Sequence, residues 1–351
     1  MTNNQQHPSS QMLFIVGTGR CGSTLVAEVL ARHPEFGFIS NLDMAVPRLN
    51  LMGQWNNWLY RATPRWLTQR DRHKNASRSR FRQSKAHFGP SEAWSLLNRY
   101  VSATVSMPYR DLTAEDATPW LSQRCRTFFE ARARIQGKAA FMHKFTGWPR
   151  LGFLHQVFPE AKFLHVVRDG RAVANSLVQM PWWYGYLGTS NWKFGALPDA
   201  YQQQWDASGN SLVVLAGLEW KLMMDAFDRT KNLIPADRWM ELRYEDMVEQ
   251  PRTSTKRALE FVGLDWTPKF ESNFQRHSFG ANKAGYLKDL SSRDIEQLDK
   301  CLASHLRQRG YAVPQASPRA PGFRLVKEGN DSLVETPAAL ISSLSPSESQ
   351  V

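Results

Sequence analysis

The chain has 351 residues, 42% of them hydrophobic, which is enough for one large α/β domain or two smaller ones. Lysine and arginine outnumber aspartate and glutamate by 44 to 32, and the net charge of +12 favours anionic ligands, anionic membrane surfaces or nucleic acid as partners. Three scattered cysteines exclude a disulfide framework or a zinc-finger pattern. With no signal-peptide pattern and no apolar run of membrane-spanning length, we expect a soluble cytoplasmic protein.

Composition divides the chain into one main domain and two flanking segments. Residues 1–11 are polar and predict a flexible N-terminus. Residues 12–311 carry the periodic apolar segments of a single folded domain. Proline, serine and alanine dominate residues 312–351, which predicts a flexible C-terminal tail.

The first elements of the domain are a strand, a glycine-rich loop and a helix. An apolar run at residues 12–16 leads into Gly17, Gly19 and Gly22, and Ser23 and Thr24 then begin a helical apolar pattern. The start of a helix offers unpaired backbone N–H groups and the positive end of its dipole, and glycines let a ligand approach the backbone closely. The stretch therefore predicts a phosphate site.

Two known patterns fit this loop. Gly17-x4-Gly22 followed by Ser and Thr resembles a P-loop in which Ser23 replaces the lysine, and Gly17-x-Gly19-x-x-Gly22 also matches a dinucleotide fingerprint. Without that lysine a γ-phosphate is held less well, whereas Arg20 provides a fixed cation inside the loop. We therefore expect a nucleotide whose chemistry is not γ-phosphoryl transfer.

The next segments are a short strand, predicted over residues 35–41, and a basic insertion at about residues 55–90. Between residues 61 and 85 the insertion has nine arginines and lysines and a single acid, Asp71. We interpret it as an insertion or mobile flap, with an anionic acceptor or a membrane surface as an alternative to simple solvation.

Strands and helices then alternate along the chain. Strands are predicted at residues 139–142, 161–167 and 239–244, and helices at residues 92–105, 121–135, 148–158, 172–178, 212–229, 252–262 and 295–306. An irregular, aromatic-rich segment covers residues 181–205. This alternation predicts an α/β fold, a P-loop-like three-layer sandwich with a mostly parallel central sheet and helices on both faces.

Candidate site residues follow the predicted strands directly. Ligands of such sheets bind at the carboxyl ends of the strands, where we expect Gly17, Lys144, Arg168 and Tyr244 to converge. Arg168 can form a bidentate contact with a phosphate, and Ser176 lies in the helix that follows it. These two residues predict a second phosphate site.

Three stretches resemble the sulfotransferase family that uses 3′-phosphoadenosine 5′-phosphosulfate (PAPS). They read GTGRCGSTL from Gly17, VVRDGRAVANSL from Val166 and LRYEDMVEQP from Leu242. The resemblance covers roughly residues 12–310. Arginine in the loop resembles the bacterial type and the protein-tyrosine branch more than the cytosolic small-molecule enzymes, which have lysine there. The resemblance implies a transferase that needs PAPS as co-substrate and no metal.

The resemblance also implies roles for particular residues. The 5′-phosphosulfate loop would comprise Gly19, Arg20, Cys21, Gly22, Ser23 and Thr24. Arg168 and Ser176 would bind the 3′-phosphate, and Tyr244 would lie near the adenosine. Lys283 and Lys288 lie where the family has a late basic motif, which this chain does not match cleanly.

Sulfuryl transfer needs charge stabilisation and a base. Arg20 would stabilise the leaving oxygen and Lys144 the sulfuryl oxygens, by analogy with phosphoryl transfer. Where related proteins have a catalytic glutamate, this chain has Ser40 and Asn41, so Asp43 is our first choice of base and His143 our second. The aromatic segment favours a small apolar or amphipathic acceptor, such as a lipid or secondary metabolite, and protein tyrosine and carbohydrate are the alternatives.

Two other functions fit parts of the sequence. A nicotinamide-dependent oxidoreductase on a Rossmann fold would use the loop glycines with Asp43 as the ribose-binding acid, but it leaves the Arg168 cluster unexplained. A non-enzymatic nucleotide-binding or nucleic-acid-binding protein would use the basic run. Nucleic acid is the less favoured partner.

Overall fold

The computed structural model describes residues 10–45, 52–62, 88–277, 279 and 284–314, together with the backbone of two short strands further on. The chain divides into two compact units, Met1–Tyr311 and Ala312–Val351. In the second unit, the strands β6 (Phe323–Glu328) and β7 (Ser332–Pro337) pair antiparallel, although the composition of this segment predicts no strand. That the rest of this unit is flexible stays a prediction.

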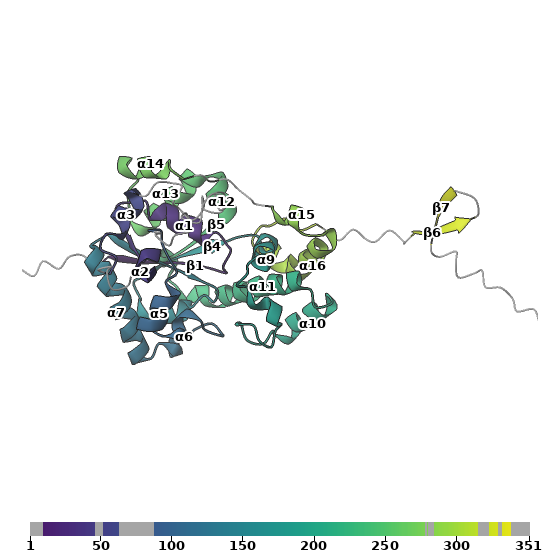
Figure 1. The fold of residues 1–351 in the computed structure, drawn as a ribbon, viewed down its shortest axis with the longest axis horizontal. Helices are drawn as coiled ribbons and strands as arrows, with labels where there is room; N and C mark the ends of the chain where they lie inside the picture. Colours follow the sequence, from purple (N-terminus) through teal and green to yellow (C-terminus); the bar gives the residue numbers. More distant parts are fainter. Residues whose placement is uncertain are drawn as a thin grey trace, which may run out of the picture. The chain divides into compact units, whose positions relative to one another are not determined.

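A five-stranded sheet forms the centre of the first unit (Figure 1). Its order is β2-β3-β1-β4-β5, and all four neighbouring pairs are parallel. The strands are β1 (Gln11–Gly17), β2 (Phe36–Phe38), β3 (Ala140–Thr146), β4 (Lys162–Val167) and β5 (Trp239–Arg243). Their carboxyl ends therefore share one edge, as the sequence predicts.

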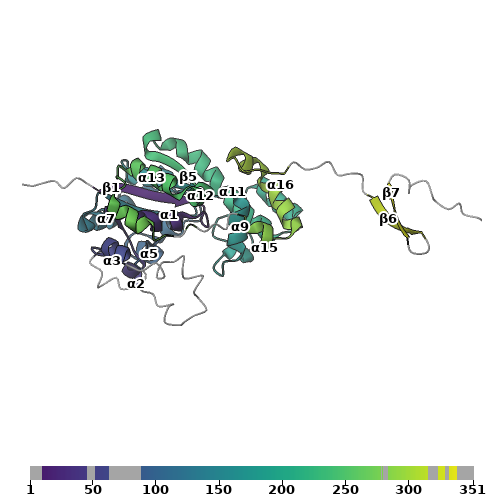
Figure 2. The same ribbon diagram turned by 90° about the horizontal axis from the view of Figure 1, so that it is seen from above.

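Helices cover both faces of this sheet (Figures 1 and 2). On one face α1 (Ser23–Leu30), α12 (Tyr244–Glu249) and α13 (Pro251–Val262) pack on aliphatic side chains of the strands. On the other, Phe14 of β1 contacts Phe129 of α7 (Pro119–Gln136), and His165 of β4 stacks on Phe227 of α11 (Leu212–Thr230). The predicted α/β class, with a parallel sheet between two helical layers, is confirmed.

The remaining helices surround these layers. They are α2 (Asn41–Ala45), α3 (Asn56–Ala62), α5 (Trp94–Tyr100), α6 (Ala103–Ser106), α8 (Leu151–Val157), α9 (Gly170–Val178), α10 (Asp199–Ala207), α14 (Pro268–Phe274), α15 (Tyr286–Asp289) and α16 (Ser292–Gln308). Short 3₁₀ turns cover Ala114–Asp116, Tyr184–Leu187, Lys231–Leu233 and Ala236–Arg238. Within the described residues, no helix combines the length and the apolar character needed to cross a membrane.

Strand β3 is longer than predicted. The predicted end at Met142 is wrong, because β3 continues through His143 and Lys144 to Thr146 and its first six residues are buried. Side chains alternate between the faces of a strand, so His143 and Lys144 point to opposite sides of the sheet. In the sequence, the polar residues His143 and Lys144 suggest the end of a strand. They are buried in the structure because residues far away in the sequence cover them.

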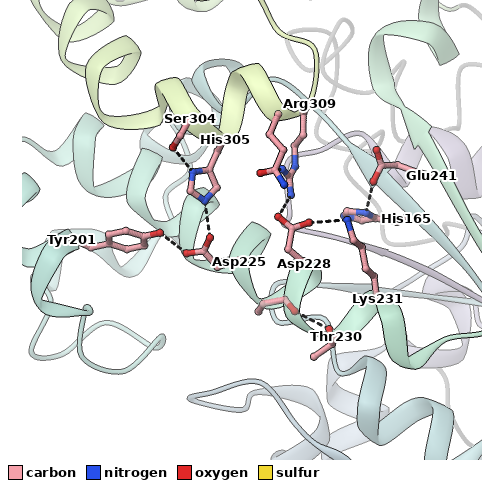
Figure 3. A network of polar contacts seen from close by, with 12 residues as sticks. His165, Tyr201, Asp225, Asp228, Thr230, Lys231, Glu241, Ser304, His305 and Arg309 are labelled. Carbon is pink, nitrogen blue, oxygen red and sulfur yellow. Dashed lines mark hydrogen bonds and ion pairs between the residues drawn. The ribbon is translucent and has the colours of Figure 1, made fainter.

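Polar contacts join α10 and α16 to α11 (Figure 3). His305 of α16 lies 2.6 Å from the Asp225 carboxylate of α11, which also accepts a hydrogen bond from Tyr201. Farther along α11, the Asp228 carboxylate accepts a hydrogen bond from Arg309 at 2.7 Å. Since α11 packs on α9, these contacts hold the helix that carries Ser176.

Candidate active site

A cavity of about 760 Å³ opens at the carboxyl edge of the sheet. The loop after β1 lines one side of it, and Lys144, Arg168 and Tyr244 line others. The segment from Pro90 to Ser95 closes the remaining side. The structure thus brings Lys144, Arg168 and Tyr244 together with the loop that follows Gly17, whereas Gly17 itself does not line the cavity.

The loop has a backbone that only certain residues adopt easily. Gly19 and Gly22 have φ angles of 82° and 96°, which side-chain-bearing residues avoid. A Cβ on Gly22 would lie 2.2 Å from Cδ2 of Tyr244, so glycine is also needed for the close packing of that ring. Arg20 itself has a φ of 51°, an unfavourable conformation for a residue other than glycine. The loop is therefore built to hold Arg20 in a fixed position.

The two predicted phosphate sites are joined in the structure. Arg20 Nε donates to Ser176 Oγ at 2.9 Å, across 156 positions of sequence. Arg168 donates to the backbone oxygen of Arg20 at 3.0 Å, and its guanidinium lies 4.5 Å from the centre of the Tyr244 ring. Burial, and then the neighbouring Arg168, lower the pKa of the Arg20 guanidinium. The neighbouring guanidinium groups of Arg20 and Arg168 favour the binding of an anionic ligand in this part of the cavity.

Lys144 lies on the other side of the loop. Its Nζ donates to Thr24 Oγ1 at 2.7 Å and is 3.4 Å from Oε1 of Glu92. Lys144 thus connects the first turn of α1 with a carboxylate at the wall of the cavity.

Glu92 is the carboxylate that the sequence analysis did not select. It accepts hydrogen bonds from Thr146 Oγ1 at 2.7 Å and from Trp94 Nε1 at 2.8 Å. Burial opposes its ionisation, but the Lys144 ammonium and these two donors outweigh that effect and lower the pKa of Glu92. The carboxylate is therefore ionised at neutral pH beside the loop cations.

A backbone pairing brings Glu92 to the site. Ser91 donates its N–H to the oxygen of Ile39 at 2.8 Å, and Ser40 forms an isolated antiparallel bridge with Pro90. This pairing follows the end of β2, beside the cavity. The Gly-Pro-Ser turn before Glu92, which follows the basic insertion, is the one signal in the sequence that could have suggested it.

Asp43, the first predicted base, lies outside this cavity. Its Oδ2 accepts from Ser40 N at 2.6 Å and from Asn56 Nδ2 at 2.6 Å, so it caps the start of α2. It lines a separate cavity of about 400 Å³, together with Leu96 and Phe128. Burial raises the pKa of Asp43. The structure therefore does not bring Asp43 together with Arg20 and Lys144.

His143, the second predicted base, faces away from the cavity. It is buried between Phe129 and Phe145, and among the described residues neither ring nitrogen has a hydrogen-bond partner. Burial lowers the pKa of His143 to about 3, so the ring is neutral.

Replacing His143 with phenylalanine should leave turnover nearly unchanged. The ring packs among aromatic side chains, and a buried polar atom without a partner costs about 1–3 kcal/mol. We expect kcat within about twofold of the wild type and an equal or higher melting temperature. A loss of kcat of about 100-fold in a folded variant would instead return His143 to the list of candidate bases.

The other predicted residues have different locations. Ser23 lines the cavity beside Thr24, whereas Cys21 is buried under the loop, where burial raises the pKa of its thiol. Lys288 is exposed on α15 and does not line the cavity. Lys283 lies outside the described residues. In the described part of the chain, no cluster of His, Cys, Asp or Glu suits a metal ion.

A profile described as "Sulfotransferase family" matches residues 12–268, which is more than half of the chain. The chain belongs to the sulfotransferase family. Two proteins named omega-hydroxy-beta-dihydromenaquinone-9 sulfotransferase, from Mycobacterium bovis and Mycobacterium tuberculosis, are each 25% identical to it over 301 residues. The alignment covers 81% of this chain and 70% of each of theirs.

A solved structure shares the fold of this sulfotransferase. The crystal structure of sulfotransferase STF9 from Mycobacterium avium has a TM-score of 0.52 at 17% identity, covering 87% of this chain and 78% of the other. The resemblance predicted from the three sequence stretches is thereby confirmed at the level of family and fold. The structure also argues against the oxidoreductase alternative. Asp43, which would be its ribose-binding acid, does not line the cavity that contains the glycine-rich loop.

Proposed function

We propose that this sulfotransferase moves a sulfuryl group from PAPS to a hydroxyl of a small apolar or amphipathic acceptor, such as a lipid or secondary metabolite. The observation that carries the proposal is that three cations, Arg20, Lys144 and Arg168, line the same cavity as the Glu92 carboxylate. The cationic side chains can bind an anionic sulfuryl donor, and the carboxylate can take the proton that the acceptor hydroxyl must lose.

The cavity suits a nucleotide with phosphates at two positions. Its volume of about 760 Å³ is typical of ligand sites. The N-terminus of α1, with Ser23 and Thr24, would take the 5′-phosphosulfate, and Arg168 with Ser176 the 3′-phosphate. Tyr244, packed on Gly22 beneath the Arg168 guanidinium, would support the adenosine.

In the proposed reaction, the acceptor oxygen attacks sulfur while the bond from sulfur to the bridging phosphate oxygen breaks. The acceptor proton passes to the Glu92 carboxylate, and the electron pair of the broken bond stays on the 5′-phosphate of the departing 3′,5′-adenosine bisphosphate. Arg20 would stabilise that growing negative charge, and Lys144 the sulfuryl oxygens. The lowered pKa of Glu92 keeps it in the proton-accepting form.

Two observations support an apolar or amphipathic acceptor. Trp182 lines the cavity and is 50% exposed, so an indole ring is available to pack on a ligand. The two mycobacterial relatives are named for an omega-hydroxy-dihydromenaquinone acceptor, which is a lipid with a hydroxyl group. Incubation with ³⁵S-labelled PAPS and a source-cell extract would identify which molecule becomes labelled.

Isothermal titration calorimetry tests the donor. We expect saturable binding of 3′,5′-adenosine bisphosphate and no heat with NAD, because the proposed cation sites suit a 5′- and a 3′-phosphate, whereas both phosphates of NAD lie in its pyrophosphate bridge. Adenosine 5′-monophosphate is the matched control, and loss of the 3′-phosphate should weaken binding by about 10-fold or more, since charge-assisted hydrogen bonds to Arg168 are lost. Equal affinity for both nucleotides would remove the proposed 3′-phosphate site.

A further inference from the structure

The outward face of α3 is apolar, although solvent-facing helix surfaces are usually polar. Trp55, Trp58, Leu59 and Ala62 follow the spacing i, i+3, i+4, i+7, which places them on one side of the helix and the turn before it. Trp55 and Trp58 are 52% and 62% exposed, and the neighbouring Met52 is 42% exposed. We call these five residues the α3 apolar face.

The two asparagines at the start of α3 point into the protein instead. Asn57 Nδ2 donates to the backbone oxygen of His33 at 2.8 Å, and Asn56 Nδ2 donates to that of Phe38 at 2.8 Å. Asn56 and Asn57 are almost fully buried. These bonds fix the orientation of the helix, so the apolar face is held outward by specific contacts rather than by chance exposure.

Cations border this face. A hollow of about 460 Å³ between α3 and α14 is lined by Trp58, Arg61, Lys269 and Arg276, and the two helices lie side by side (Figure 1). Arg276 donates to the backbone oxygen of Arg61 at 2.9 Å, which holds the two guanidinium groups on the same rim.

Among residues 10–45, 52–62, 88–277, 279 and 284–314, no acidic group neutralises these cations at close range. Within the described part of the chain no carboxylate lines the hollow, and Glu271 of α14 is paired with Arg252. Glu35 attracts Arg61 only from outside the hollow. The rim is therefore available to an external anion.

We propose that the α3 apolar face and the cations Arg61, Lys269 and Arg276 form a docking surface for an anionic phospholipid membrane. Indole rings favour the boundary between headgroups and acyl chains, and arginine and lysine beside them attract anionic headgroups. Exposed Met52 and partly buried Leu59 add aliphatic surface that membrane insertion buries but that stacking on nucleic acid bases does not use. This combination favours a membrane over RNA, and it does not depend on sulfuryl transfer.

Vesicle flotation with the full-length chain tests the surface. The protein should float with vesicles of phosphatidylcholine and phosphatidylglycerol and remain free with phosphatidylcholine alone. Trp58→Ser and the double variant Lys269→Glu, Arg276→Glu should each lower the partition coefficient by about tenfold or more. Donor and acceptor are absent from the assay, so its outcome is independent of the proposed reaction.

Matched variants on other helices serve as controls. Trp120, which is 61% exposed near the start of α7, and Lys300 of α16 provide the same changes away from the surface. Trp120→Ser and Lys300→Glu should bind vesicles like the wild type, and all variants should keep their melting temperature. Equal binding to neutral vesicles, unchanged binding of the docking-surface variants, or loss of binding to an RNA oligonucleotide with vesicle binding intact would each overturn the proposal.

Discussion

Replacing Arg20 with alanine is expected to lower kcat by about 10³-fold while changing the affinity for 3′,5′-adenosine bisphosphate by less than about tenfold. The guanidinium is held in the cavity by its bond to Ser176, and its proposed partner is the charge that grows on the leaving oxygen. Alanine keeps the Cβ that the backbone φ of 51° already accommodates. The Arg168 contact is made to the backbone oxygen of residue 20, so truncation leaves it in place.

Arg168→Ala is the matched control, because it removes a guanidinium on the same cavity. We expect it to weaken nucleotide binding by about 10–100-fold with a smaller change in kcat at saturation, since the 3′-phosphate does not react. Binding by calorimetry and single-turnover rates at saturating donor separate the two effects. Equal losses in both parameters for both variants would contradict the division of roles between Arg20 and Arg168.

Replacing Glu92 with glutamine is the second change with a large expected effect. Removing the proposed base should lower kcat by about 10²–10⁴-fold. Nucleotide binding should be retained or strengthened, because a negative charge 3.4 Å from Lys144 is removed beside an anionic ligand. Single-turnover rates, together with calorimetry on the same preparation, check both expectations.

The pH dependence of kcat/KM of the wild-type enzyme tests independently whether Glu92 is the proton acceptor. The pKa of Glu92 is lowered below its ordinary value of 4.5, so the base stays ionised as pH falls and loses its charge only under more acidic conditions. The acid limb of kcat/KM due to this group should therefore lie below about pH 4.5. An acid limb near the ordinary range of histidine would contradict Glu92 as the proton acceptor.

Asp43→Asn is the control for Glu92→Gln, because it neutralises a buried carboxylate in a different cavity. It should lower the melting temperature, since Asp43 accepts hydrogen bonds from Ser40 and Asn56, but leave kcat within about tenfold. If Asp43→Asn abolished turnover while Glu92→Gln did not, the base would be Asp43 after all.

The family, the fold class and the position of the glycine-rich loop followed from the sequence alone. Strand, loop and helix are local patterns, so the spacing of Gly17, Gly19 and Gly22 and the apolar periodicity after Thr24 carry their own signal. The convergence of the loop with Arg168 and Tyr244 also followed, because parallel strands place their carboxyl ends at one edge.

Only the tertiary structure decided which carboxylate faces the loop and which surface of α3 is exposed. Glu92 reaches the cavity because Ser91 pairs with Ile39, far away in the sequence. Asp43 lies near the position of the catalytic glutamate of related proteins, and His143 follows a predicted strand end. Capping contacts bury Asp43, however, and strand alternation turns His143 to the opposite face. Such side-chain positions depend on contacts between distant segments, for which a local pattern carries no signal.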